Sequence, residues 1–206
     1  MQKCILKYIK CLKDQKVIAF PTDTVWGLSV DALNLQAIDN LINIKKRKLN
    51  KSFSVLISSV DKLNQYAILS DFEKLLVKEV WPGSFSIVFK AKDLNWAKQL
   101  GSQNGSIAFR CINNKFTKNL LDKWGGALIT TSANSSGSKV CNNSHDILKL
   151  SPDIKICSYF INFVEKLNTP STVIKVLDKK IKILRNSYQY DLLKEIAAKK
   201  NWTLNE

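Results

Sequence analysis

Three arginines have the most specific chemistry in this chain. Of its 32 basic residues only three are arginines, at positions Arg47, Arg110 and Arg185. A guanidinium group binds a carboxylate or a phosphate through two parallel hydrogen bonds, which a lysine ammonium group cannot do. Because the chain uses lysine almost everywhere else, the three arginines predict a shared cleft that binds small anions.

Polar clusters surround these arginines. Each combines hydroxyl, amide or charged side chains and lies at the end of a predicted strand or helix, where α/β proteins bind ligands. The clusters are residues 20–28 (FPTDTVWGL), 45–51 (KKRKLNK), 106–110 (SIAFR), 130–137 (TTSANSSG), and 170–173 (PSTV) with 183–185 (ILR). Taken singly, each could be a turn, a solvated helix end or a surface loop. Their conjunction with all three arginines favours a binding site.

The elements that must position these clusters follow two hydrophobic periodicities. Short apolar or alternating runs predict strands, and apolar residues three or four positions apart predict helices. Strands are predicted at 16–20, 53–58, 84–90, 106–111, 127–131, 171–177 and 180–184, and helices at 1–12, 34–45, 60–69, 71–80, 115–124, 144–150 and 190–199. Only two residues join the last two strands, so that pair should form an antiparallel hairpin. The pattern predicts an α/β fold with one twisted sheet of parallel and antiparallel strands flanked by helices.

Length and composition limit the classes of protein to which the chain can belong. Its 206 residues suit one domain spanning 1–206, and 45% hydrophobic with 24% charged residues is a globular composition. No apolar run is long enough for a membrane helix and no secretory signal is recognisable, so we expect a soluble, cytoplasmic protein with no membrane partner. The net charge of +15 favours polyanions such as ATP or RNA.

Cysteine and histidine are too few for most metal sites. The five cysteines are odd in number and none forms a Cys-x-x-Cys pair, so we expect reduced thiols and neither a disulfide framework nor a zinc site. His145 is the only histidine, and its polar surroundings favour a solvated helix start. We therefore predict no metal ion bound by the protein's own side chains.

The order of the clusters resembles the YrdC/Sua5 family of threonylcarbamoyl-AMP synthases, in its short bacterial, TsaC-like form. That family is marked by Pro-Thr-(Glu/Asp)-Thr-x-Tyr-Gly-Leu, Lys-x-Arg with a nearby basic residue, Trp-Pro-Gly, a strand ending in Val-Arg, Ser-Ala-Asn-x-Ser-Gly, Ser-Thr-Val and a late Leu-Arg. This chain carries the counterparts in the same order, at residues 21–28, 45–51, 81–83, 109–110, 132–137, 171–173 and 184–185. Trp26 stands where the family usually has Tyr. The resemblance implies a single YrdC/RibB-like domain.

The resemblance also implies an activity. The family makes L-threonylcarbamoyladenylate and pyrophosphate from L-threonine, bicarbonate or CO₂, and ATP with Mg²⁺, for the t6A modification at position 37 of tRNAs that read ANN codons, and a separate transferase complex completes that modification. The reaction needs positioning and positive charge against the phosphates rather than a protein nucleophile. Carried over by motif, the residues that would bind L-threonine are Thr22, Arg110, Thr130 and Ser171. The catalytic residues would be Lys45 and Arg47. The residues that would bind the nucleotide are Lys45, Arg47, Lys51, Ser106, Ser132, Asn134 and Arg185.

Two other functions fit the same residues. A non-catalytic factor that binds tRNA or double-stranded RNA, or that matures ribosomes, could use the basic surface alone. Such a factor has no need to place Arg110 beside Thr22 and Ser132 in a hydroxyl-lined pocket. A paralogue of the same fold could instead use another acceptor in place of threonine. The sequence predicts the pocket better than it predicts the amino acid that enters it.

Overall fold

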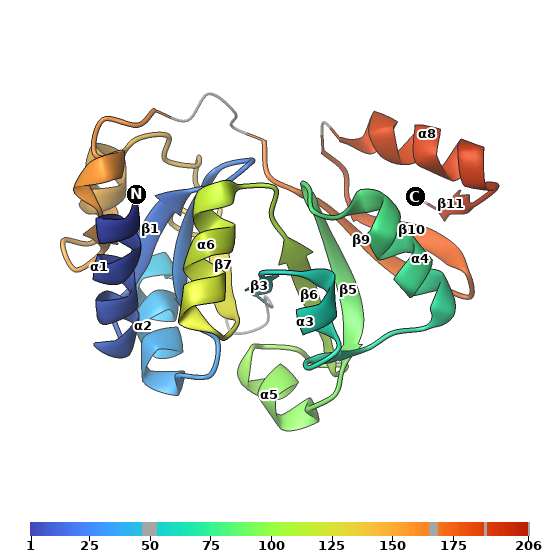
Figure 1. The fold of residues 1–206 in the computed structure, drawn as a ribbon, viewed down its shortest axis with the longest axis horizontal. Coiled ribbons are helices and arrows are strands. Elements are labelled where there is room, and N and C mark those ends of the chain that lie inside the picture. Colours follow the sequence, from blue (N-terminus) through green and yellow to red (C-terminus); the bar gives the residue numbers. More distant parts are fainter. Residues whose placement is uncertain (47–52, 165–168, 188, 206) are drawn as a thin grey trace.

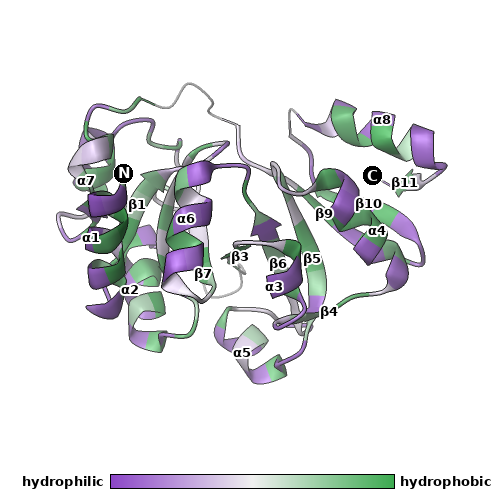
Figure 2. Cartoon of the chain, in the orientation of Figure 1, coloured by the Kyte–Doolittle hydropathy of each residue, from purple (hydrophilic) through white to green (hydrophobic). Residues whose placement is uncertain are grey.

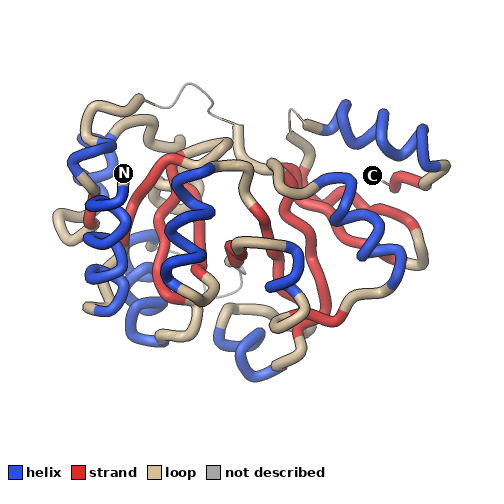
Figure 3. The backbone as a smooth tube through the Cα atoms, in the orientation of Figure 1, coloured by secondary structure: helices blue, strands red, loops and turns tan. Residues whose placement is uncertain are grey.

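One mixed sheet runs through the centre of the molecule (Figure 3). The computed structural model describes residues 1–46, 53–164, 169–187 and 189–205. Among these residues ten strands follow the order β11-β10-β9-β5-β6-β3-β7-β2-β1-β8, and β4 pairs with β5 beside this path. The strands are β1 (Ile18–Pro21), β2 (Trp26–Asp31), β3 (Ser54–Ile57), β4 (Ala67–Ile68), β5 (Phe85–Ala91), β6 (Ser106–Cys111), β7 (Leu128–Ser132), β8 (Lys155–Ile156), β9 (Thr172–Leu177), β10 (Lys180–Arg185) and β11 (Thr203–Asn205).

The sheet contains both kinds of strand pairing. The pairs β1–β2, β2–β7, β3–β7, β4–β5, β5–β6 and β9–β10 are antiparallel. The pairs β1–β8, β3–β6, β5–β9 and β10–β11 are parallel. Asp178 and Lys179, which join β9 to β10, both have positive φ, as a tight hairpin turn requires. The predicted mixed sheet and the predicted hairpin are confirmed.

Helices flank the sheet, and Figure 1 shows α6, α3 and α4 across its near face with the chain termini at opposite ends. Figure 2 shows hydrophilic and hydrophobic bands alternating along these helices, as expected where one side packs on a sheet and the other meets water. The helices are α1 (Gln2–Lys13), α2 (Leu35–Lys45), α3 (Val60–Leu63), α4 (Asp71–Val80), α5 (Leu94–Gln99), α6 (Lys115–Trp124), α7 (Ser144–Leu150) and α8 (Tyr190–Lys200), with one 3₁₀ turn, η1 (Ser158–Phe160).

Side-chain caps explain where several helices begin. Asn34, Asn114 and Asn143 each accept a backbone N–H in the first turn of α2, α6 and α7. Ser70 and Glu73 form a reciprocal capping box at α4. These caps are local in sequence, so the starts of all four helices agree with the prediction to within one residue.

An aromatic core joins α1 and α6 to the first strand. The rings of Tyr8, Phe20 and Phe116 lie 5.9–6.3 Å apart between centroids. The Tyr8 hydroxyl donates to the Ala19 carbonyl at 2.5 Å and accepts from the Cys157 N–H at 2.9 Å. Burying each large apolar side chain contributes about 1.5–3 kcal/mol. This packing holds β1, and with it the turn at residues 22–25, in a defined place.

Tertiary contacts change some of the predicted elements. The helix predicted at 60–69 is wrong beyond Leu63, because Ala67 and Ile68 pair with β5 as strand β4. Strand β2 is not among the predicted strands, although Trp26, Leu28 and Val30 alternate with more polar or smaller residues. The short elements α5, β8 and β11 were not predicted either, because they carry too few residues to show a period.

The cysteines differ in part from the prediction. The structure joins Cys4 of α1 to Cys157, which follows β8, as a disulfide with a Cα–Cα distance of 5.7 Å. The prediction that all five thiols are reduced is therefore wrong for this pair, because packing of α1 brings together residues 153 positions apart. Cys11, Cys111 and Cys141 are free.

Two further expectations concern the environment of His145 and the absence of a membrane helix. His145 is exposed near the start of α7, where its Nδ1 atom lies 3.7 Å from the carboxylate of Asp146, in agreement with a solvated helix start. In the part of the chain that the structure describes, each helix is too short or too polar to cross a membrane.

Candidate functional site

The turn between β1 and β2 is built around the hydroxyl of Thr22. Thr22 Oγ1 donates to the Val25 carbonyl at 2.6 Å and accepts the backbone N–H groups of Thr24 and Val25, both at 3.2 Å. A threonine side chain that replaces backbone hydrogen bonds in this way stabilises a tight turn. Thr22 therefore shapes the wall of the site, and its turn presents Asp23 and Thr24 to Arg110 at the end of β6.

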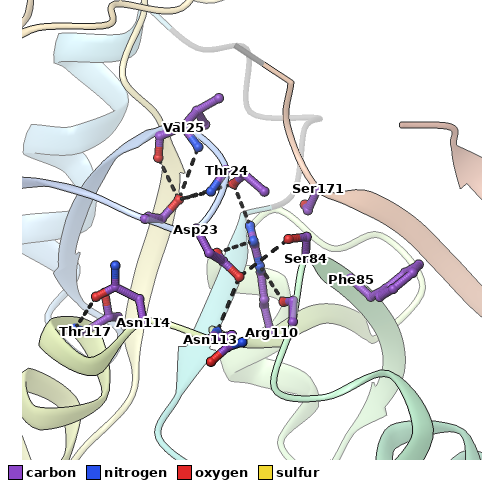
Figure 4. A network of polar contacts seen from close by, with 12 residues as sticks. Asp23, Thr24, Val25, Ser84, Phe85, Arg110, Asn113, Asn114, Thr117 and Ser171 are labelled. Carbon is purple, nitrogen blue, oxygen red and sulfur yellow. Dashed lines mark hydrogen bonds and ion pairs between the residues drawn. The ribbon is translucent and has the colours of Figure 1, made fainter. Parts of the chain in front are cut away.

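Arg110, at the end of β6, is held by three different protein groups. Its Nε donates to the Gly83 carbonyl at 3.2 Å, its Nη1 donates to Thr24 Oγ1 at 3.0 Å, and its Nη2 forms an ion pair with Asp23. The residue is only 6% exposed. Figure 4 shows the guanidinium group lying among these partners. The contacts orient the planar group, so that its position does not depend on a ligand.

Asp23 is itself anchored by residues of two loops, one after β6 and one before β5. One carboxylate oxygen accepts the Asn113 N–H at 3.3 Å, and Ser84 Oγ lies 3.5 Å from the same oxygen (Figure 4). Gly83, whose carbonyl contacts Arg110, belongs to the Trp-Pro-Gly segment, and a Cβ atom at this position would lie 2.7 Å from the Val80 carbonyl oxygen. The segment therefore needs glycine to bring its backbone to Arg110.

Arg185, on β10, is bound to Ser171, the residue that precedes β9. Its Nε and Nη2 donate to the Ser171 carbonyl at 3.0 and 2.8 Å, and Nη2 also reaches Ser171 Oγ at 3.1 Å. The Ser171 hydroxyl in turn lies 2.8 Å from Ser86 Oγ on β5. Burial lowers the pKa of Arg185 from its ordinary value, but an arginine remains charged at neutral pH. A second oriented cation thus stands beside a pair of hydroxyls.

The opposite wall comes from β2 and β7. Ser29 Oγ donates to Thr130 Oγ1 at 3.0 Å across the antiparallel pair. A Cβ atom at Gly27 would lie 3.0 Å from Thr130 Oγ1 and 3.4 Å from Thr22 Cγ2. Glycine at this position therefore lets both threonine side chains lie close to the backbone of β2.

Lys45, at the end of α2, lies behind the serine-rich loop that follows β7, residues 133–138. It is 1% exposed, and its Nζ donates to the Ser132 carbonyl at 2.6 Å and to Asn134 Oδ1 at 2.5 Å. Ser132 Oγ also contacts Asn134 Oδ1 at 2.8 Å. The contact partners of the ammonium group include two of the residues predicted to bind nucleotide, so Lys45 positions this loop.

Six of the predicted site residues line one cavity of about 300 Å³. They are Thr22, Arg110, Thr130, Ser132, Ser171 and Arg185. Within the described parts of the chain, the lining contains two arginines, several hydroxyls and no carboxylate. Such a cavity suits a ligand that carries negative charge and hydrogen-bonding groups.

The other predicted residues lie elsewhere. Lys45 and Asn134 contact Ser132 from behind the cavity wall, and Ser106, at the start of β6, lines a neighbouring hollow. Arg47 and Lys51 lie outside the described residues. Arg110 and Arg185 therefore share one cleft as predicted, whereas the placement of the third arginine stays a prediction.

Four site residues were not predicted from the sequence. Asp23 and Thr24 fall inside a quoted motif but had no role, although Asp23 is the one carboxylate of that motif. Ser86 and Gly83 contact site residues from β5 and the turn before it. Gly83, like Asp23 and Thr24, lies in a quoted motif, whereas Ser86 had no local signal.

The family model described as "Telomere recombination", Sua5_yciO_yrdC, matches residues 10–187 of this chain. The chain belongs to the Sua5/YciO/YrdC family. The threonylcarbamoyl-AMP synthase of Wigglesworthia glossinidia brevipalpis is 30% identical over 181 residues, which cover 86% of this chain and 91% of that protein. The protein of the same name from Coxiella burnetii is 34% identical over 132 residues, 63% of this chain and 69% of the relative.

Solved structures share the fold. The crystal structure of P. abyssi Sua5 complexed with L-threonine superposes with a TM-score of 0.84 at 21% identity and covers 98% of this chain. This chain spans only 58% of that Sua5 chain. E. coli YciO gives a TM-score of 0.79 at 20% identity, with 91% of both chains covered. The predicted mixed α/β architecture is therefore that of these family members.

Proposed function

We propose that this protein is an L-threonylcarbamoyladenylate synthase. In this reaction the amine of L-threonine combines with CO₂, releasing a proton, or with bicarbonate, releasing water, to form a carbamate. The carbamate oxygen then attacks the α-phosphorus of ATP. The bond from the α-phosphorus to the bridging oxygen breaks, and pyrophosphate leaves with the electron pair. The observation that carries the proposal is one hydroxyl-lined cavity that holds Arg110 and Arg185 in a chain of this family. The reaction would make the protein a nucleotidyltransferase.

The threonine end of the cavity is assigned to Arg110. Its guanidinium group is oriented by Asp23, Thr24 and Gly83. A guanidinium group can bind the substrate carboxylate through two parallel hydrogen bonds. Thr130 and Ser171 add hydroxyl groups on either side of the same cavity. Fixing the substrate in this way lowers the entropic part of the barrier before chemistry begins.

The nucleotide end is assigned to Ser132 and Arg185, and Asn134 and Lys45 support it from behind the cavity wall. Arg185 is a preoriented positive charge, and charge fixed before the reaction is the most effective way to stabilise phosphates in the transition state. Lys45 would act through the loop that it anchors, while Arg47 and Lys51 complete the basic set by family resemblance. Lys45 is therefore proposed as a positioning residue, a narrower role than the catalytic one expected from the sequence.

Mg²⁺ is proposed to enter with ATP. Among the described residues there is no group of three or more His, Cys, Asp or Glu side chains that could hold a metal ion. Magnesium prefers phosphate oxygens and retained water to an all-protein cage, so an ATP complex fits this donor set. When bound, the ion would neutralise charge on the phosphates.

The proposed product implies later partners. An adenylate of threonylcarbamate must be transferred to another molecule, and t6A formation on tRNA by a separate transferase complex is the proposed use. Non-catalytic binding of RNA is the second candidate, and the net charge of +15 is the observation in its favour. A hydroxyl-lined cavity with two tethered arginines favours the small-molecule reaction.

One incubation separates these functions. The protein is mixed with ATP, Mg²⁺, bicarbonate and each amino acid in turn, and pyrophosphate and AMP are measured. Pyrophosphate release that requires both bicarbonate and L-threonine is the expected result. Turnover with a different amino acid would assign the paralogue function. Salt-sensitive RNA binding without any threonine-dependent turnover would support the non-catalytic factor instead.

A further inference from the structure

A second hollow of about 420 Å³ adjoins the cavity, and Val88 and Leu184 line both. We call it the lysine hollow, and its lining includes Ser102, Ser106, Lys175 and Lys182. It contains Ser106, which the family resemblance links to the nucleotide but which lies outside the main cavity. The hollow is thus a continuation of the site along the same sheet.

Strand register shows how the two spaces connect. Thr130, Ser54, Ala108, Val88, Lys175 and Lys182 are successive partners across β7, β3, β6, β5, β9 and β10. Figure 1 shows β5, β9 and β10 side by side. Short side chains occupy the middle of this row, and two lysines end it. The row therefore forms a shallow floor that leads from the hydroxyls of the cavity to a positive edge.

The two lysines are direct cross-strand neighbours on one face of the sheet. Lys175 and Lys182 are register partners in an antiparallel pair, an arrangement in which like charges repel. No salt bridge within the described residues involves either lysine, and no carboxylate of that part of the chain lines the hollow. An anion with more than one negative charge would relieve the repulsion by contacting both ammonium groups.

The rim of the hollow is preformed. Ser102 Oγ accepts the Ser106 N–H at 3.0 Å, and Asn104 Oδ1 accepts the same N–H at 3.1 Å. Gly101 and Gly105 take positive φ in this loop, which closes the turn beside β6. The loop therefore walls the hollow without the help of a ligand.

Spacing limits what the ligand can be. Lys182 and Arg185 are three positions apart on β10, and Lys175 is two positions from Val173, the register partner of Arg185. The lysines therefore lie about 7–10 Å along the strands from Arg185. A chain of condensed phosphates can extend over such a distance, whereas a single phosphate cannot. A duplex RNA would need cations spread over an outer surface rather than gathered in a hollow.

We propose that the lysine hollow binds condensed phosphate, either the polyphosphate part of a bound nucleotide or pyrophosphate after its release. The proposal deepens the proposed function and rests on it for the source of the phosphate. Lys175 and Lys182 supply the charge, and Ser106 supplies a hydroxyl toward the main cavity.

The test is calorimetric binding to the full chain, without turnover. The ligands are inorganic pyrophosphate, Mg²⁺-ATP, and AMP, which lacks condensed phosphate. The hollow variant is Lys175→Gln/Lys182→Gln. The matched control is Lys3→Gln/Lys7→Gln, which removes the same charge from the exposed side of α1. Circular dichroism verifies folding, and the single variant Lys182→Glu, at an exposed position, replaces the double variant if that one does not fold.

The expected result is pyrophosphate binding weakened about tenfold or more in the hollow variant, with less than a twofold change in the control and for AMP. Weaker ATP binding in the same variant would assign the intact triphosphate, and unchanged ATP binding would assign the released product. Equal losses in both variants, equal losses for AMP, or no loss at all would overturn the proposal. Loss of duplex RNA binding with unchanged pyrophosphate binding would overturn it in favour of RNA. Because binding is measured directly, a chain that turns over no threonine can still pass this test.

Discussion

Replacing Arg110 with lysine separates the charge of this residue from its shape. Lysine keeps the positive charge, but its single nitrogen cannot reach Gly83, Thr24 and Asp23 together as the guanidinium group does. Arg110 is almost fully buried, so bulk water does not replace the lost contacts. We therefore expect Arg110→Lys to fold, to keep the ion pair with Asp23, and to bind the substrate carboxylate through one hydrogen bond instead of two.

The size of the effect follows from that lost bond. A hydrogen bond to a charged group contributes about 1.5–3 kcal/mol. Loss of one such bond should raise the KM for L-threonine about 10- to 150-fold, because each 1.4 kcal/mol corresponds to about a factor of ten. The KM for ATP should change much less, since Arg185 and Ser132 lie on other strands of the cavity wall.

The assay is threonine-dependent release of pyrophosphate over a series of threonine and ATP concentrations. Arg185→Lys is the matched control, because it makes the same chemical change on the other side of the cavity and should raise the KM for ATP instead. Thermal unfolding of both variants separates loss of fold from loss of binding. Unchanged threonine dependence in a folded Arg110→Lys variant would refute the role given to Arg110, and identical profiles in the two variants would refute the division of the cavity.

Three further predictions concern single residues. Gly83→Ala places a Cβ atom against the Val80 carbonyl and should lower threonine-dependent turnover at least tenfold, measured beside thermal unfolding; full activity would contradict the tight turn. Thr172→Val should stabilise the protein by about 1 kcal/mol in urea unfolding, because the fully buried Thr172 hydroxyl has no hydrogen-bond partner among the described residues. The control variant Thr117→Val should destabilise the protein, because it loses the hydrogen bond to Asn114. Burial raises the pKa of Cys111 from 9.0 to about 11, so between these pH values the folded state keeps the thiol neutral while the unfolded chain ionises it. The free energy of unfolding should therefore fall by about 1–2 kcal/mol as the pH rises from 9 to 11. Cys111→Ala should remove this decline from unfolding curves measured at each pH.

Local patterns predicted the elements whose ends depend on nearby residues. The starts of α4 and α6 agree with their predicted positions because Ser70 and Asn114 cap them within one turn. The helix predicted through Leu69 failed because pairing of Ala67 with β5 overrode helical periodicity. Strand β2 has an alternating pattern, but its position inside a polar motif hid that pattern.

The motifs also predicted most of the cavity lining. Arg110 and Arg185 were singled out because they are arginines in a lysine-rich chain, and the structure brings them to one cavity. Local sequence does not indicate Asp23 as the partner of Arg110, since the two residues are 87 positions apart. The disulfide between Cys4 and Cys157 was missed for the same reason.

By itself, the sequence determined which chemical groups were available: arginine guanidinium groups, hydroxyl groups and a flexible backbone at selected glycines. Only the tertiary structure decided which of them meet. Lys45 carries the charge expected of a phosphate ligand, yet the docking of α2 buries it against Ser132 and Asn134. Lys175 and Lys182 belong to no motif, yet the register of β9 and β10 sets them face to face. Periodicity and caps act over a few residues, whereas the partners of a side chain in a sheet depend on strand order and register, which the whole chain must settle together.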